Sequence, residues 1–112
     1  IGAGVRIGFL AEELNKNKRM IVIGSCLNTG ITGLTLGGGI GFLRRKYGLT
    51  LDHLLSATVI LADGNIVKCN KEQNSDLFWA LCGGGAGSFG IVTDLTFVTH
   101  PVTKMVLFEL WI

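Results

Sequence analysis

The chain is organised around residues 24–48, GSCLNTGITGLTLGGGIGFLRRKYG, where seven glycines fall within the first eighteen positions. The run Gly37-Gly38-Gly39 and the nearby Gly41 remove Cβ atoms from a backbone that apolar segments flank. Such a backbone is either bent sharply or approached closely by another group. In a globular protein the group that usually approaches such a backbone is a cofactor, so this stretch is the first candidate for a binding site.

Composition indicates a folded domain that belongs to a longer polypeptide. The chain has 112 residues, 48% of them apolar, and a mean hydropathy of +0.51, which is enough for a core and excludes disorder. It begins at Ile1 without a methionine and ends on the apolar run 106–112, so we expect further protein on both sides. A net charge of +2 predicts neither nucleic acid nor an anionic membrane as partner. No signal peptide is present, but a fragment cannot show one, so the compartment stays open.

The cysteines and histidines do not form a metal site in the sequence. Cys26, Cys69 and Cys82 make no CxxC pair and no ligand spacing with His53 or His100. Three cysteines are also an odd number, which does not fit a disulfide framework. We therefore expect no bound metal.

An uncharged stretch of 24 residues, Met20–Leu43, raises the alternative of a transmembrane helix. Gly33, Gly37 and Gly41 even stand at GxxxG spacing. The stretch is, however, rich in glycine and small polar residues, and its opening residues 20–23 resemble a buried β-strand. We therefore expect a water-exposed fold rather than a membrane helix.

Two glycine patterns imitate the dinucleotide-binding fingerprint. The opening residues 1–8, IGAGVRIG, lack a preceding strand and an acidic residue about 20 positions later. Residues 85–90, GAGSFG, lie between an expected helix and an expected strand, which is the reverse of the required order. Neither predicts a Rossmann fold, although the second remains a place where another group could approach the backbone.

Hydrophobic periodicity predicts alternating helices and strands. Asn28 or Thr29 is expected to cap the helix that follows it, and Ser75 to cap a later one. Asp63-Gly64 suits a two-residue type I′ turn, which predicts an antiparallel pair and excludes a plain parallel sheet. We expect helices at 7–14, 31–35, 42–47 and 76–82, and strands before residue 6 and at 20–23, 54–62, 65–69, 91–99 and 105–111.

Several motifs occur together and in a fixed order: LTLGGGIG, RKYGLT, ADG, DLFWAL and GSFGIVT. In this combination the chain closely resembles the FAD-binding domain of the berberine bridge enzyme-like oxidoreductases, within the wider vanillyl-alcohol oxidase group. The similarity covers nearly the whole chain, and the succession of motifs is far more specific than any one of them.

The resemblance implies an α+β fold, a mainly antiparallel β-sheet flanked by helices, as in the second lobe of a PCMH-type FAD-binding domain. Residues 1–112 would then be part of a single FAD-binding domain, the C-terminal lobe. The first lobe and the substrate domain would lie elsewhere in the same polypeptide, which is the expected partner of this chain. The implied function is oxidation of a small-molecule alcohol, sugar or amine by hydride transfer to FAD; the catalytic side chains are not identified.

The resemblance also implies which residues contact FAD. Residues of the 25–33 segment would line the flavin ring and pyrophosphate, the glycine bend would let them do so, and a third segment would face the adenine. The full set is Ser25, Cys26, Asn28, Thr29, Gly30 and Gly33, then Gly37, Gly38, Gly39 and Gly41, then Gly90, Ile91 and Val92.

Cys26 stands where members with doubly attached flavin carry a cysteine bonded to flavin C6. Those members usually continue with Pro-Thr and later Gly-Gly-His, whereas this chain has Leu27-Asn28 and Gly33-Leu34. A cysteinyl bond, a histidyl bond alone and a non-covalent flavin therefore all stay open at this point.

Two other function classes compete with the flavoprotein interpretation. One is a non-catalytic interaction domain with glycine-rich loops. The other is a thiol enzyme in which His53 would activate Cys26, although no motif orients this pair.

Overall fold

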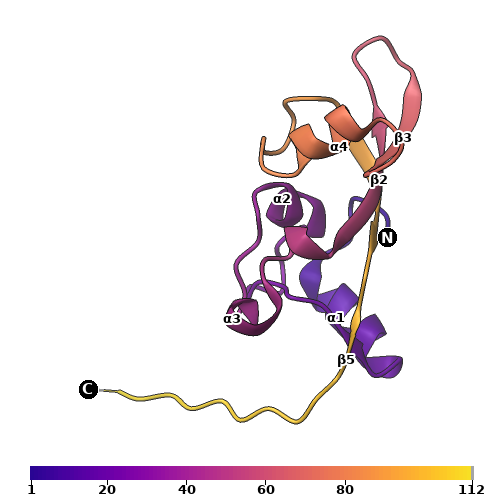
Figure 1. Cartoon of the computed structure of the whole chain (residues 1–112). Helices are drawn as coiled ribbons and strands as arrows, with labels where there is room; N and C mark the ends of the chain where they lie inside the picture. Colours follow the sequence, from indigo (N-terminus) through magenta and orange to yellow (C-terminus); the bar gives the residue numbers. More distant parts are fainter. Residues whose placement is uncertain (112) are drawn as a thin grey trace.

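The computed structural model describes residues 1–111 and has an α+β fold with antiparallel sheets (Figure 1). Its larger sheet has three strands in the order β3-β2-β4, and a second sheet pairs β1 with β5. The α+β class expected from the sequence is therefore confirmed. The elements are α1 (Ile7–Lys16), β1 (Arg19–Met20), α2 (Ile31–Leu36), α3 (Arg44–Tyr47), the 3₁₀ turn η1 (Leu51–His53), β2 (Leu54–Ile60), β3 (Ile66–Asn70), α4 (Ser75–Leu81), β4 (Ile91–Phe97) and β5 (His100–Pro101).

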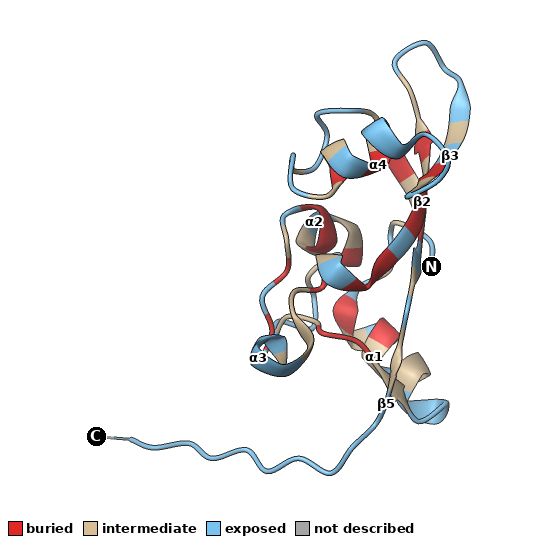
Figure 2. Ribbon diagram, viewed as in Figure 1, coloured by how far each residue is buried: buried red, intermediate tan, exposed pale blue. Residues whose placement is uncertain are grey.

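The larger core forms between the three-stranded sheet and α4. Ala57 and Val59 of β2 alternate with more exposed neighbours, as expected of a strand that buries one face. They pack with Phe78 and Leu81 of α4 and with Leu95 of β4. Figure 2 shows these buried segments where α4 meets the sheet.

A smaller core joins α1 to the glycine-rich half of the chain. Leu10 of α1, Ile21 after β1 and Ile31 of α2 form this cluster, and each is nearly or fully buried. The apolar positions of α1 recur at helical spacing, so one face of the helix is free to pack here. Ile21 and Ile31 thus anchor the chain on either side of residues 25–29, the first part of the candidate site 25–33.

The N-termini of two helices differ from the prediction. Gly30, not Asn28 or Thr29, is the N-cap of α2, and it makes no side-chain cap bond. Asn74 precedes α4 in a left-handed conformation, and Ser75 is the first helical residue. Both predictions assumed a local side-chain cap, but neither helix has a side-chain cap bond at its N-terminus.

The β2–β3 hairpin is also built differently from the prediction. The amide of Gly64 donates to the carbonyl of Leu61 at 2.9 Å, and the amide of Leu61 donates to Asn65 at 2.9 Å. Gly64 has φ +84°, whereas Asp63 is not in the positive-φ region that a type I′ turn requires. The turn is therefore a three-residue loop with glycine in its left-handed position, and the two-residue prediction was wrong.

Three expected strands are shorter or absent. The strand expected before residue 6 is reduced to isolated bridges of Gly2 with Asp94 and of Arg6 with Gly30. Only Met20 of the expected 20–23 strand belongs to β1, which pairs with β5 in the register Met20↔His100. Residues 21–23 follow without strand pairing although Ile21 and Val22 are buried. Residues 105–111 form no strand and extend away from the body (Figure 1), because no neighbouring strand in the described residues pairs with them.

The uncharged stretch 20–43 does not form one long helix. Its only helical part is α2, which is six residues long. No helix within residues 1–111 has the length and apolar character needed to cross a membrane.

Candidate functional site

The loop of residues 25–29 is anchored to the start of α1 through its carbonyl groups. The amide of Ile7 donates to the carbonyl of Thr29 at 2.9 Å, and the amide of Gly8 donates to that of Leu27 at 2.9 Å. These amides of the first turn of α1 have no partner within the helix, and Arg6, the N-cap, makes no side-chain cap bond. The loop carbonyls therefore cap α1 and point into the protein.

Four of the five amide groups of the same loop are left free, and the fifth, that of Thr29, donates to the carbonyl of Cys26 at 3.1 Å. Within residues 1–111, the amides of Ser25, Cys26, Leu27 and Asn28 donate no hydrogen bond to the protein, and all four residues are exposed. A series of exposed, unpaired backbone N–H groups suits the acceptor oxygens and nitrogens of a flavin or a phosphate. The strongest feature of the site is that carbonyls of this loop bond to α1 while the amides of residues 25–28 stay free.

Four of the candidate glycines fall into two groups, according to what an added Cβ atom would touch. At Gly30 and Gly33 an added Cβ would meet no atom within 4 Å. At Gly39 it would collide with the side chain of Thr50, and at Gly41 with the carbonyl of Ile23. Gly30 and Gly33 thus border open space, whereas Gly39 and Gly41 are required by packing within the protein.

The glycine bend is held by the turn that follows it. Gly38 and Gly39 have φ values of +104° and +79°, which L-residues rarely adopt. Their carbonyls accept the amides of Leu51 at 3.0 Å and Thr50 at 2.9 Å, respectively. Thr50 is fully buried and was not identified from the sequence, where nothing marks its contact eleven residues back.

The bend lies beside the 25–29 loop. Ser25, Ile40, Gly41 and Phe42 line a hollow of about 140 Å³ together with Arg44, whose Nη1 donates to the carbonyl of Gly41 at 3.4 Å. The predicted segments 25–33 and 37–41 are therefore brought together, with the side chain of Arg44 beside them.

The third predicted segment is not part of this cluster. The N-terminal residues lie between the two, because Ala3 donates its amide to Thr93 and accepts the hydroxyl of Thr32. Gly90 has φ +141°, and a Cβ atom at this position would collide with Val59 and Ile60. Val92 is buried in the larger core. Ile91, by contrast, is 69% exposed, so of this segment's side chains it is the one that a ligand could contact.

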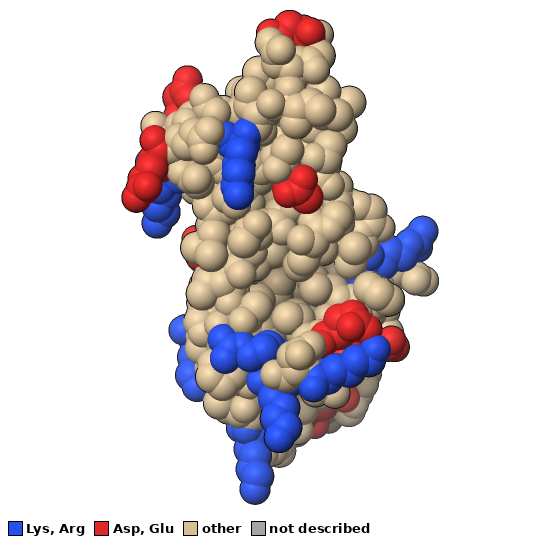
Figure 3. Space-filling view, turned by 90° about the vertical axis from the view of Figure 1, so that its right-hand side faces the viewer, with Lys and Arg blue, Asp and Glu red and all other residues tan. Residues whose placement is uncertain are grey.

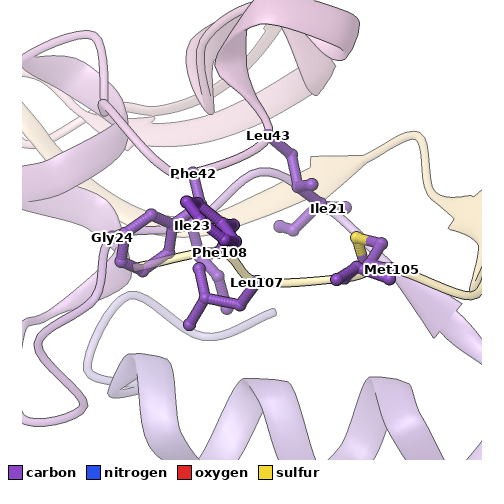
Figure 4. A pocket seen from close by; sticks show the side chains of 9 residues that line it. Ile21, Ile23, Gly24, Phe42, Leu43, Met105, Leu107 and Phe108 are labelled. Carbon is purple, nitrogen blue, oxygen red and sulfur yellow. The ribbon is translucent and has the colours of Figure 1, made fainter. Parts of the chain in front are cut away.

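A larger apolar groove of about 580 Å³ lies behind the candidate loop. Figure 4 shows the side chains that line it, which carry only carbon apart from the sulfur of Met105. The lining comes from three segments: Ile21, Ile23 and Gly24; Phe42 and Leu43; and Met105, Val106, Leu107 and Phe108.

The cysteines do not form a reactive centre with histidine. Both ring nitrogens of His53 are engaged, Nδ1 with the carbonyl of Leu49 and Nε2 with His100, so His53 cannot activate Cys26. Burial raises the pKa of the Cys69 and Cys82 thiols, which keeps them protonated at neutral pH. The thiol-enzyme alternative is therefore wrong.

Residues 1–111 contain no cluster of three or more side chains that could ligate a metal ion. On the face in Figure 3, lysine and arginine gather mainly toward one end, and the middle is largely uncharged. What the described residues offer a ligand at the candidate site is therefore backbone amides, apolar surface and Arg44.

Comparison with known proteins identifies the family. Residues 1–70 match the family model described as "FAD binding domain". The chain belongs to the FAD-binding domain family. The chitooligosaccharide oxidase of Gibberella zeae is 44% identical over 109 residues, which are 96% of this chain and 22% of that protein.

Solved structures place this FAD-binding domain more closely. The chain is 46% identical, with a TM-score of 0.86, to a glucooligosaccharide oxidase from Acremonium strictum described with a 6-S-cysteinyl, 8α-N1-histidyl FAD; the match covers 90% of this chain and 21% of that one. It is 44% identical, with a TM-score of 0.86, to BBE-like 1 of Physcomitrella patens, over 90% of this chain and 22% of that one. The resemblance to berberine bridge enzyme-like proteins is confirmed. The chain spans about a fifth of the length of the curated relatives it matches.

The residues present fit the cofactor of this family, FAD. The free amides of residues 25–28 would donate hydrogen bonds to the flavin. The open backbone at Gly30 and Gly33 would let the flavin ring system approach closely. The apolar side chains of Ile40 and Phe42, which are 66% and 74% exposed, offer it a hydrophobic neighbour. The family excludes an interaction domain unrelated to flavoproteins.

Proposed function

We propose that this chain is the C-terminal lobe of the FAD-binding domain of an FAD-linked oxidoreductase, and that the first lobe and the substrate domain lie elsewhere in the polypeptide. The observation that carries the proposal is the loop 25–29, in which the carbonyls of Leu27 and Thr29 accept amides of α1 while the amides of residues 25–28 stay free. Relatives about 45% identical over nearly the whole chain support it.

The reaction we propose is oxidation of a C–H bond next to an oxygen or nitrogen in a small molecule. FAD supplies the acceptor for the hydride, while the hydroxyl or amine of the substrate loses a proton. The role of this chain is to hold the cofactor: the amides of residues 25–28 donate to it, and Gly30 and Gly33 let it approach the backbone. No side chain of this chain is assigned to proton transfer.

Sugars are the substrate class we propose first, with alcohols and amines as the alternatives. The support is that relatives similar over nearly the whole chain are named chitooligosaccharide oxidase and glucooligosaccharide oxidase. The site described above lies on the cofactor side and does not select a substrate.

Spectroscopy of the full-length protein tests both parts of the proposal. A purified protein with flavin absorption bands would support the cofactor assignment, and a colourless protein that cannot be reconstituted with FAD would contradict it. Anaerobic mixing with a panel of oligosaccharides, alcohols and amines should bleach these bands for one class. Bleaching by an amine alone would overturn the sugar assignment but leave the FAD assignment intact.

A further inference from the structure

His53 is a buried polar residue, 2% exposed, and both of its ring nitrogens have partners. Its Nδ1 lies 2.9 Å from the carbonyl oxygen of Leu49. A carbonyl only accepts, so Nδ1 must carry a hydrogen atom. The Nε2 atom of His53 lies 2.8 Å from Nε2 of His100, which is 47 residues away in sequence.

This geometry limits how many protons the pair can hold. With both rings neutral, Nε2 of His53 accepts a hydrogen bond from Nε2 of His100. With one added proton, His53 donates from Nε2, and His100 accepts after shifting its own hydrogen to Nδ1. With two added protons both Nε2 atoms carry hydrogen, and the 2.8 Å contact becomes a repulsive one between two cations.

The groups around the pair do not offset a second positive charge. Tyr47 of α3 stacks on His100 with ring centroids 4.4 Å apart, and Lys46 lies over the Tyr47 ring. Arg19 of β1 donates from Nε to the hydroxyl of Thr99 beside His100, at 2.8 Å. Burial first, then His53 and Arg19, lower the pKa of His100. The acidic residue of the same turn, Asp52, already accepts the amide of Leu49 at 2.7 Å.

The histidine pair is mechanically connected to the glycine bend. His53 ends the turn η1, whose residues Thr50 and Leu51 donate to the carbonyls of Gly39 and Gly38. On the other side, the carbonyl of His53 accepts the amide of Val98 at 2.8 Å. The contact with His100 thus fixes η1, and η1 fixes the bend.

We propose that His53 and His100 are positioning residues that form a proton-sensitive clamp on the glycine bend. The clamp is closed with at most one added proton, and it opens when both rings are charged. Opening frees η1 and the bend, so that FAD is held less firmly at acid pH; this last step rests on the proposed function.

The direction of the pH effect follows from the pair. An imidazole in the unfolded chain takes up its proton near pH 6.5, whereas folding opposes protonation of His100. Below that pH the unfolded state therefore binds more protons than the folded state, and stability falls as the pH falls. Above about pH 6.5 the unfolded state no longer binds more protons at this position, so the full contribution of the pair to stability is present.

The test compares the full-length protein with His100→Gln between pH 8 and 5. Glutamine keeps an N–H donor for His53 but does not titrate in this range. We expect the parent to lose thermal stability and release flavin below about pH 6.5, and His100→Gln to lack this step. Thr99→Val serves as the matched control: it removes a contact of Arg19 beside His100 without removing a titratable group, and it should keep the step. An unchanged acid step in His100→Gln overturns the proposal.

Two further measurements keep the outcome clear. Amide hydrogen exchange of the parent, corrected for the intrinsic pH dependence, should speed up at Thr50 and Leu51 below about pH 6.5 relative to β2; equal protection at all pH values contradicts the clamp even if His100→Gln fails to fold. The melting temperature can also be measured on protein without flavin, so this readout does not require that FAD binds. If the protein binds no FAD, the proposed function fails, while loss of the acid step in the melting temperature of His100→Gln still supports the clamp.

Discussion

At the scale of single residues, the glycines of the central stretch do two different jobs. Gly39 and Gly41 are small because other parts of the protein touch them, whereas Gly30 and Gly33 are small beside open space. Substitutions at the two kinds of position should therefore act on different properties, one on folding and the other on FAD binding.

Gly39→Ala should destabilise the protein by about 2 kcal/mol or more, because its Cβ would collide with Thr50 and its φ is +79°. Gly33→Ala is the matched control. It lies in α2, where alanine should stabilise the helix by up to about 1 kcal/mol, and it should weaken FAD binding if the cofactor approaches there. Thermal unfolding and FAD titration of both full-length variants measure the two effects. Equal losses of stability would show that the division of the glycines is wrong.

Cys26 is exposed in the loop with the free amides, so we predict that its side chain touches the flavin. Cys26→Ala should shift the flavin absorption bands or the redox potential of the full-length protein. The flavin mass that stays on the denatured parent and variant reports separately whether a covalent bond exists. A variant with the parent's spectrum, potential and retained mass would contradict contact.

At the scale of elements, carbonyls of a distant loop, rather than neighbouring side chains, cap the start of α1. This arrangement links the fold directly to the site, since the bonds that complete α1 also turn the loop amides outward. By contrast, the β2–β3 hairpin turn is exposed and far from the described site, and its glycine has φ +84° for a purely structural reason.

Gly64→Ala should therefore cost about 1 kcal/mol of stability through the positive φ, without a steric clash, because no atom lies within 4 Å of the added Cβ. Turnover per bound flavin should stay at the parent value. Chemical denaturation and steady-state kinetics of the full-length variant check this, and reduced turnover at unchanged stability would place the hairpin near the chemistry.

At the scale of the whole molecule, much apolar surface is exposed. Large side chains such as Phe42 and Trp79 are 74% and 79% exposed, and residues 102–111 are exposed throughout (Figure 2). Exposed apolar surface of this extent marks places where more protein packs. We expect the remaining lobe and domain of the polypeptide to cover it and to complete the FAD site.

If the other lobe completes the site as proposed, the isolated 112-residue chain should bind FAD weakly or not at all. Titration of the chain with FAD, with circular dichroism to verify folding, measures this. Tight stoichiometric binding by the folded chain would show that the site is complete without the rest of the polypeptide.

Much of the fold and the cofactor could be predicted because their signals are local. The apolar spacing from Ile7 to Leu14 predicts a helix, Asp63-Gly64 predicts a hairpin, and the motif order predicts an FAD-binding domain; each depends on neighbours in sequence. Which residues contact FAD stays a prediction.

Only the tertiary structure decided what depends on residues far apart in the chain. The capping of α1 by Thr29, the packing of Gly39 against Thr50 and the pairing of His53 with His100 leave no periodic or compositional signal. They arise when chain segments with independent local preferences are folded against each other, and free backbone groups and cavities exist only after that packing is complete. The sequence by itself therefore determined most of the elements and the family, and the packing determined which glycines border open space and which are held by other groups.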